Sequence, residues 1–284
     1  MIEYDNKNWF NFLIKRSGYH YEGVFASLVV YGLIAAGLTA VHRRFDLGIF
    51  HMPTSFHTVL GLVIGLLLVF RTNTAYERWW EGRKQLGALV NTSRICAFKF
   101  KTYDTNDVEI YTLLAAFPWA MKVHLRDKNF EEVKTHLPLS MLQKFEKADH
   151  KPLFILMELS LKTHQLYKLG TISGEQLIIV ETKLNELADI LGACERIHST
   201  PIPFGYALHL KRILLIYMLT LPFGFIDSLN WWSIPVVMVV FYTMIGIELI
   251  AEEIEDPFGT DVNDLPFDEL EGKIRANIEE IKNS

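Results

Sequence analysis

The stretch VLGLVIGLLLVFRTNTAYERWW, residues 59–80, joins an uncharged apolar block to a charged and aromatic one. A helix needs about 20 predominantly apolar residues to cross the hydrocarbon of a bilayer. Residues 53–58 are mild, so residues 53–70 come close to that length before Arg71 introduces the first charge. No Gly follows until Gly82 and no Pro until Pro118, and one Gly costs a helix only about 1 kcal/mol. We therefore predict a single helix that begins near Pro53, crosses a membrane and continues past Gly82, with helical spacing as far as Val90.

Three further apolar blocks have the length and composition of membrane spans. They cover residues 24–41, 213–228 and 231–250, and with the block at 55–71 they predict four crossings. Pro222 and Gly224 interrupt the third block, which is tolerated where neighbours satisfy the freed backbone groups. The remaining residues, about 72–212 and 251–284, are polar or amphipathic with helical spacing and no β-rich stretch. The fold class predicted is an all-α integral membrane protein with a helical cytoplasmic region.

The composition agrees with this division and excludes some classes of function. Half of the 284 residues are hydrophobic, 21% are charged, and the net charge is −5. A negative charge without basic runs argues against a nucleic-acid partner. Cys96 and Cys194 are far apart in helical stretches, so no disulfide is expected. The first twenty residues lack the apolar core of a cleavable signal peptide.

Charge placement gives an orientation. Most Lys and Arg lie in residues 71–212, which favours a cytoplasmic location for that region, although Arg43 and Arg44 in a short outer loop oppose it. An even number of crossings then places both termini on the cytoplasmic side. The membrane expected is the inner (plasma) membrane of the cell. Trp9, Trp231 and Trp232 are candidates for the interfacial aromatic belt.

A helix start is visible in the polar region. Ser173 can cap a helix while Gln176 reaches back to the Ser173 amide, which is the capping-box pattern. Apolar residues follow at roughly helical spacing, beginning with Ile178 and Val180.

Leu62, Leu66 and Phe70 recur every four residues and so lie nearly on one face of the second span. Gly61 and Gly65 form an adjacent stripe of the kind that lets helices approach closely. A ring of such helices, packed through the glycines, would present the apolar stripe to a central axis, and hydrophobic constrictions can gate by dewetting. The alternative is that the stripe faces lipid or a neighbouring helix.

Charged residues follow the stripe directly. Arg71 and Arg78 can reach the headgroups or pair with Glu77 and Glu81 at helical spacing, and a structural role is favoured over a functional one.

A second charged segment, EEIEDPFGTDVND at residues 252–264, follows the last span. Its clustered oxygens suit a hard cation such as calcium, but the spacing does not match an EF-hand loop and a solvated acidic turn is the alternative.

Signals for other chemistry are missing from the sequence. No two of the ten histidines are spaced i, i+4 and no Cys–His ligand pattern occurs, so no structural zinc site is expected. No phosphate-binding glycine loop or nucleophile elbow is present, so no enzyme is predicted. The spans carry no mid-membrane acid or base, which favours a passive pore over a pump.

Three places in the chain are distinctive in combination: the apolar stripe followed by Arg78-Trp79-Trp80, then Pro201-Ile202-Pro203 before the third span, and Asp256-Pro257-Phe258-Gly259 after the fourth. In these places the chain resembles the bestrophin family of ion channels, and specifically its bacterial branch. The resemblance implies a homopentamer around one axial pore, with a neck at Leu62, Leu66 and Phe70. The family often has Ile or Phe at these positions, so two Leu are a departure. A second constriction would lie at the start of the Ser173 helix, in a register that places Ile178, Ile179 or Val180 at the pore.

The resemblance also bears on ions. Animal members are calcium-activated chloride channels with a calcium clasp in the acidic segment, where Asp256, Asp261 and Asp264 fall here. Thr260, Val262 and Asn263 stand where that pattern has carboxylates, which weakens the case for calcium, so no cofactor is required. Bacterial members resemble channels that can prefer monovalent cations such as sodium. The apolar neck does not decide the sign of the ion, because an aromatic ring offers a positive edge and a negative face.

Two functions of different classes follow. The first is a pentameric channel for monovalent ions, whose partners are further copies of the chain, membrane lipid and the permeant ions. The second is a membrane-anchored helical interaction module without conduction, which predicts that residues 71–212 fold alone when excised.

Overall fold

The computed structural model describes residues 19–45, 52–105 and 107–284, with no side-chain description for residues 19–22. Within those residues the regular elements are helices, and none is a strand, as predicted. The predicted position of Trp9 in an aromatic belt lies outside the described residues. The helices are α2 (Tyr19–Phe45), α3 (Thr54–Thr102), α4 (Val108–Leu125), α5 (Glu131–Lys134), α6 (Leu139–Lys147), α7 (Lys151–Lys168), α8 (Gly174–Ser199), α9 (Phe204–Leu229), η2 (Asn230–Trp232), α10 (Ser233–Glu255) and α11 (Phe267–Asn283).

The chain divides into two compact units. The first, here the membrane unit, comprises Met1–Trp79, Pro201–Asp256 and Asp261–Asp264. The second, here the polar unit, comprises Trp80–Thr200, Pro257–Thr260 and Leu265–Ser284. Helix α3 supplies residues to both units as one uninterrupted helix, which confirms the predicted continuation past Gly82 to Val90 and extends it to Thr102.

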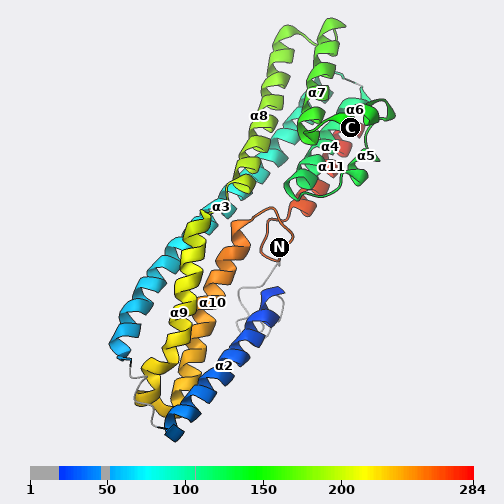
Figure 1. Cartoon of the computed structure of the whole chain (residues 1–284). Coiled ribbons are helices and arrows are strands. Elements are labelled where there is room, and N and C mark those ends of the chain that lie inside the picture. The colour runs from blue at the N-terminus through cyan, green and yellow to red at the C-terminus, as the bar shows by residue number, and fades with distance from the viewer. Residues whose placement is uncertain (1–18, 46–51, 106) are drawn as a thin grey trace. The chain divides into compact units, whose positions relative to one another are not determined.

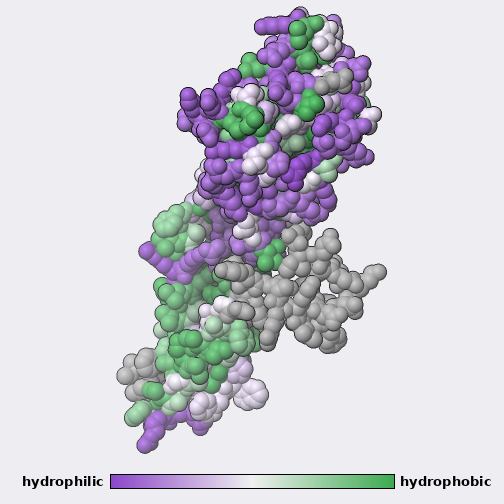
Figure 2. All heavy atoms as spheres, turned by 90° about the vertical axis from the view of Figure 1, so that its right-hand side faces the viewer, coloured by the Kyte–Doolittle hydropathy of each residue, from purple (hydrophilic) through white to green (hydrophobic). Residues whose placement is uncertain are grey.

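Three runs of the described chain are long and apolar enough to cross a membrane: Gly23–Phe45, Thr54–Thr102 and Phe204–Glu255. The last run contains two helices, α9 and α10, which turn back on one another at η2 and lie side by side (Figure 1). The four predicted spans therefore fall on α2, the first part of α3, α9 and α10. Figure 2 shows hydrophobic residues gathered over the membrane unit and hydrophilic residues over the polar unit.

The core of the membrane unit joins all four of these helices. Its buried members are Tyr31 and Ala35 of α2, Ile64 and Leu68 of α3, Leu210, Leu214, Tyr217, Met218 and Leu221 of α9, and Val237 of α10. Gly61 permits part of this packing, since a Cβ there would lie 2.6 Å from Tyr217 Oη. The close approach predicted at Gly61 is thus made within the subunit, whereas a Cβ on Gly65 would meet no described atom within 4 Å.

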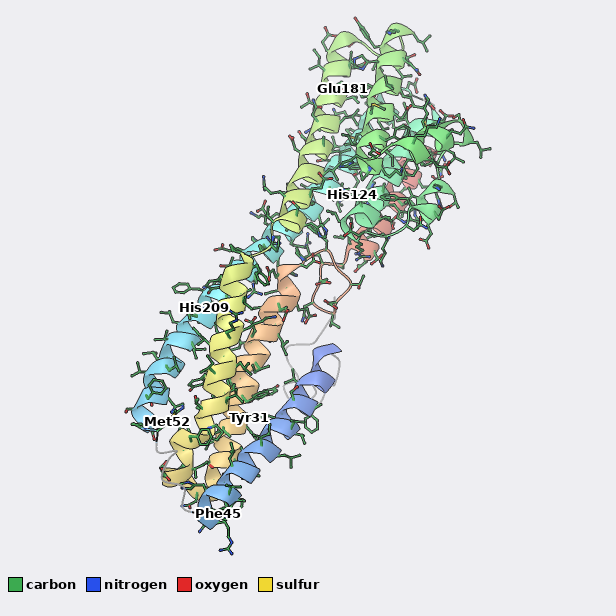
Figure 3. All side chains as sticks on the ribbon, viewed as in Figure 1. Tyr31, Phe45, Met52, His124, Glu181 and His209 are labelled. Atoms are coloured by element: carbon green, nitrogen blue, oxygen red, sulfur yellow. The ribbon has the colours of Figure 1, made fainter. Side chains whose placement is uncertain are left out.

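A hydrogen bond explains how α9 tolerates its internal proline. Pro222 has no N–H, which leaves the carbonyl of Met218, four residues earlier, without its helical donor. The Tyr31 hydroxyl of α2 donates to that carbonyl over 2.8 Å, and Figure 3 labels Tyr31. A neighbouring helix therefore satisfies the freed carbonyl, as the sequence predicted.

Helix α4 is the centre of the polar unit. It packs against α7, α8 and α11, and buries most of its length, from Ile110 to Leu125. Helix α8 begins with the predicted capping box, since Gln176 N donates to Ser173 Oγ and Ser173 N donates to Gln176 Oε1. Cys96 and Cys194 are buried free thiols, in agreement with the expectation of no disulfide.

Candidate pore-lining surface and the ion-pair cluster beside it

Helix α3 has a covered face and an uncovered face within the subunit. His57, Ile64, Leu68 and Arg71 are almost fully buried. Leu62, Leu66 and Phe70 project away from that covered side and are 76%, 56% and 55% exposed. The stripe is therefore left largely uncovered by the subunit's own helices and is available to a pore, to lipid or to a neighbouring subunit.

The uncovered face is wider than the stripe. Val59, Val63 and Val69 also expose about half or more of their side chains. Exposure alone does not separate a pore-facing residue from a lipid-facing one, and an uncovered face this wide accommodates both.

The start of α8 separates the three candidates for the second constriction. Ile178 is 67% exposed and Ile179 is 40% exposed. Val180 is 1% exposed and belongs to the core of the polar unit. Val180 is thus occupied by packing within its own subunit, and Ile178 and Ile179 are the two that remain available.

A buried ion-pair cluster lies one residue beyond Phe70. Arg71 Nη2 is 2.6 Å from Glu255 Oε2, and Arg71 Nε is 3.8 Å from Glu248 Oε2. Arg71 therefore pairs with two carboxylates of α10, whereas the sequence analysis considered headgroups or carboxylates of its own helix as partners for the arginines. Glu81 instead pairs with Lys84.

Glu255 also joins the three sequence elements that carried the family resemblance. Its Oε1 accepts a hydrogen bond of 2.7 Å from the Ile202 amide, in the Pro201-Ile202-Pro203 segment. Its backbone carbonyl accepts a bond of 3.0 Å from Arg78 Nε. Sequence reasoning missed Glu255, since no local spacing links residues of α3 with a residue of α10.

The acidic segment after α10 is held by hydrogen bonds from both sides. The Asn263 amide donates to Glu253 Oε1 over 2.9 Å, and Trp79 Nε1 donates to the Asn263 carbonyl over 2.9 Å. The Asp261 amide donates to Asp264 Oδ2 over 2.6 Å. Burial raises the pKa of Asp264 to about 6, with Asp261 and further acidic neighbours adding to the shift.

The three carboxylates expected at a calcium clasp do not converge. Asp256 and Asp261 are exposed, while Asp264 is buried, with Oδ2 engaged by an amide and Oδ1 without a hydrogen-bond partner. Calcium takes six to eight oxygen ligands at about 2.3–2.6 Å. Among the described residues, three His, Cys, Asp or Glu side chains come within ligand distance of one another only at His124, His150 and Glu195, on other helices.

Apolar helices of membrane-spanning length, packed through a common core and carrying one uncovered apolar stripe, define an all-helical integral membrane protein. The chain belongs to the bestrophin family, since the family described as bacterial and fungal bestrophin protein matches residues 1–280.

Curated relatives and solved structures agree with the family. The voltage-dependent anion channel-forming protein sll1024 of Synechocystis sp. is 41% identical over 241 residues, covering 82% of this chain and 78% of the relative. The protein alr2987 of Nostoc sp., described in the same words, is 35% identical over 289 residues, covering 97% and 92%. The structure of a bacterial bestrophin homologue from Klebsiella pneumoniae aligns with a TM-score of 0.88 at 27% identity, covering 92% of this chain and 99% of that one. Relatives described as channel-forming also agree with the expectation that this protein is not an enzyme.

Proposed function

We propose that this chain is one subunit of a homopentameric ion channel whose axial pore is narrowed by Leu62, Leu66 and Phe70. The observation that carries the proposal is the placement of these three side chains on the face of α3 opposite its buried residues. Channel-forming relatives that align over most of the chain support it.

Self-assembly accounts for the uncovered apolar surface in the following way. Each subunit turns the stripe toward the shared axis, and the flanking valines and Gly65 contact lipid or the next subunit. Gly65 suits a subunit contact, since a Cβ there would meet no described atom of its own chain within 4 Å and small residues let helices approach closely.

The ring of apolar side chains controls passage by dewetting and leaves the sign of the ion to other features. Leu and Phe carry no net charge, so the net charge of the neck does not favour anions over cations or the reverse. We propose conduction of monovalent ions, with chloride first, because the curated relatives are named for anions, and sodium as the alternative. Ile178 or Ile179 at the start of α8 forms the second constriction.

The same proposal places the protein in the plasma membrane with both termini in the cytoplasm. Its partners are four further copies, the surrounding lipid and the permeant ions, and it uses no resident cofactor. The excess of Lys and Arg in residues 71–212 supports this orientation.

Flux through purified protein in liposomes tests the proposal. Wild-type protein should release a chloride or sodium gradient, and Leu66→Ala and Phe70→Ala should raise the rate by widening the neck. Leu219→Ala, at an exposed position of α9, is the matched control and should leave the rate unchanged. Absence of flux of both ions in wild type and in both neck variants would reject the channel.

A further inference from the structure

Three side chains from three helices of the polar unit meet at one carboxylate oxygen. Glu195 Oε1 of α8 lies 2.8 Å from His124 Nε2, in the last turn of α4, and 2.6 Å from His150 Nε2, at the start of α7. The two imidazole centroids are 4.7 Å apart. All three side chains remain about one-third exposed, so an ion in solution can reach them. Figure 3 labels His124.

The donor set is one that zinc prefers. Two imidazoles and one carboxylate form an established set of three protein ligands for Zn²⁺, with a fourth position left to water. Bonds of about 2.1 Å in a tetrahedral site separate ligand atoms by about 3.4 Å. The present separations from Glu195 Oε1 are 2.8 and 2.6 Å, so small side-chain rotations that open them would admit the metal.

Without a metal the three side chains are joined by hydrogen bonds, and these fix which imidazole nitrogen of His150 carries the proton. The Leu153 amide donates to His150 Nδ1 over 3.2 Å, so Nδ1 accepts and the proton of neutral His150 sits on Nε2. That Nε2–H then donates to Glu195. A metal on Nε2 requires the proton to move to Nδ1, which removes the acceptor of the Leu153 amide.

This proton shift makes the site selective. The lost hydrogen bond from the Leu153 amide to His150 Nδ1 must be offset by a strong metal–imidazole interaction, which Zn²⁺ and Co²⁺ provide. Mg²⁺ and Ca²⁺ prefer oxygen ligands and bind imidazole poorly, so they should not displace the hydrogen bonds.

We propose that His124, His150 and Glu195 form a binding site for one imidazole-preferring divalent cation, with Zn²⁺ the best match, that ties α4, α7 and α8 together. Spacing along the sequence did not reveal the site, because its ligands lie on three helices and no two histidines share a helical turn. The site is independent of the acidic segment after α10 and of ion conduction.

The test is Zn²⁺ titration of chelator-stripped, full-length protein in detergent by calorimetry. Wild type should bind one Zn²⁺ per chain, and 1 mM Mg²⁺ or Ca²⁺ should not compete. His124→Gln, His150→Gln and Glu195→Gln should each weaken binding by at least about tenfold. His164→Gln is the matched control, because His164 and Glu181 pair at 3.3 Å between α7 and α8 without a third ligand, and it should bind as wild type does.

Co²⁺ absorption keeps the test decisive if a variant folds poorly. Co²⁺ in wild type should give the intense visible absorption bands of a four-coordinate site. Zn²⁺ should remove these bands by displacing Co²⁺. Co²⁺ bound nonspecifically at the surface gives only the weak bands of octahedral coordination. Weak bands in wild type, or equal Zn²⁺ affinity of wild type and Glu195→Gln, would overturn the site and leave a hydrogen-bonded cluster. Equal loss of binding in His164→Gln would overturn it too.

Discussion

Arg71 Nη2 lies 2.6 Å from Glu255 Oε2, and the two side chains are only 2% and 15% exposed. The pair joins α3, one residue after Phe70, to the last residue of α10. A buried ion pair between a guanidinium and carboxylates is costly to break, because removal of one partner leaves the other as an uncompensated buried charge. The proposed neck is therefore fixed at its polar end by a contact that no single helix contains.

Arg71→Met should lower the free energy of unfolding by about 3–5 kcal/mol, because it leaves Glu255 and Glu248 buried without their cation. Thermal or chemical unfolding of the detergent-solubilised protein measures the change. Arg83→Met, at an exposed position of the same helix, is the control and should change stability by less than about 0.5 kcal/mol. Equal losses in the two variants would show that the ion pair has no particular role.

Tyr31→Phe should destabilise the membrane unit by about 1 kcal/mol, the net contribution of one hydrogen bond. In a Pro222→Ala background the new amide of residue 222 can donate to the Met218 carbonyl, so Tyr31→Phe should cost less there. A double-mutant cycle on unfolding free energies measures the difference. The same cost in both backgrounds would contradict the assignment of Tyr31 as the substitute donor.

The sequence was sufficient for features that depend on neighbouring residues. Apolar block length located the spans, and the Ser173 and Gln176 pair located a helix start, since both signals act within one helix. It failed for Arg71, whose carboxylate partner Glu255 is far away in the sequence, and for the His124, His150 and Glu195 cluster. Val180 shows the same limit, because only the packing of α8 decides which side of a helix is buried. The stripe of Leu62, Leu66 and Phe70 was visible from spacing, but its exposure depended on which side of α3 the other helices cover.

Asp264→Asn should stabilise the protein at pH 7.5 and have little effect near pH 4. The pKa of Asp264 is raised from 3.8 to about 6 by burial, so between these values the native state holds a proton that the unfolded state has lost. Stability from this group therefore falls as the pH rises through 4 to 6, by an amount on the order of 1–3 kcal/mol. The asparagine keeps an oxygen for the Asp261 amide and carries no charge to bury.

Melting temperatures of wild type and Asp264→Asn across pH 4 to 8 check this expectation. The difference between the two should grow with pH and level off above about pH 7. Asp149→Asn, at an exposed position, should show no such trend. A difference between wild type and Asp264→Asn that does not vary with pH would contradict the buried, raised-pKa carboxyl.

Residues 80–200 expressed alone should fail to fold as a stable soluble domain, contrary to the interaction-module hypothesis. The polar unit also requires α11, whose Phe267, Ile274 and Ile278 are buried and which packs against α4. Lys122 of α4 adds ion pairs to Asp268 at 3.0 Å and Glu271 at 3.3 Å. Solubility and circular dichroism of the fragment, with and without residues 265–284 attached through a flexible linker, measure the contribution of α11. A fragment that folds equally well without α11 would favour the anchored module.

The most direct test of the channel is to measure whether a water-soluble thiol reagent reaches the cysteine of Leu66→Cys in proteoliposomes. Cys96 and Cys194 are 1% and 0% exposed, so wild type supplies an unreactive background. If Leu66 lines the pore, a charged, membrane-impermeant reagent should modify Leu66→Cys and block its ion flux, while leaving wild type and Leu219→Cys unaffected. The contrary result is that the reagent neither modifies the Leu66→Cys thiol nor changes its ion flux, as at Leu219→Cys. That result would place the stripe in lipid and contradict a pore lined by Leu66.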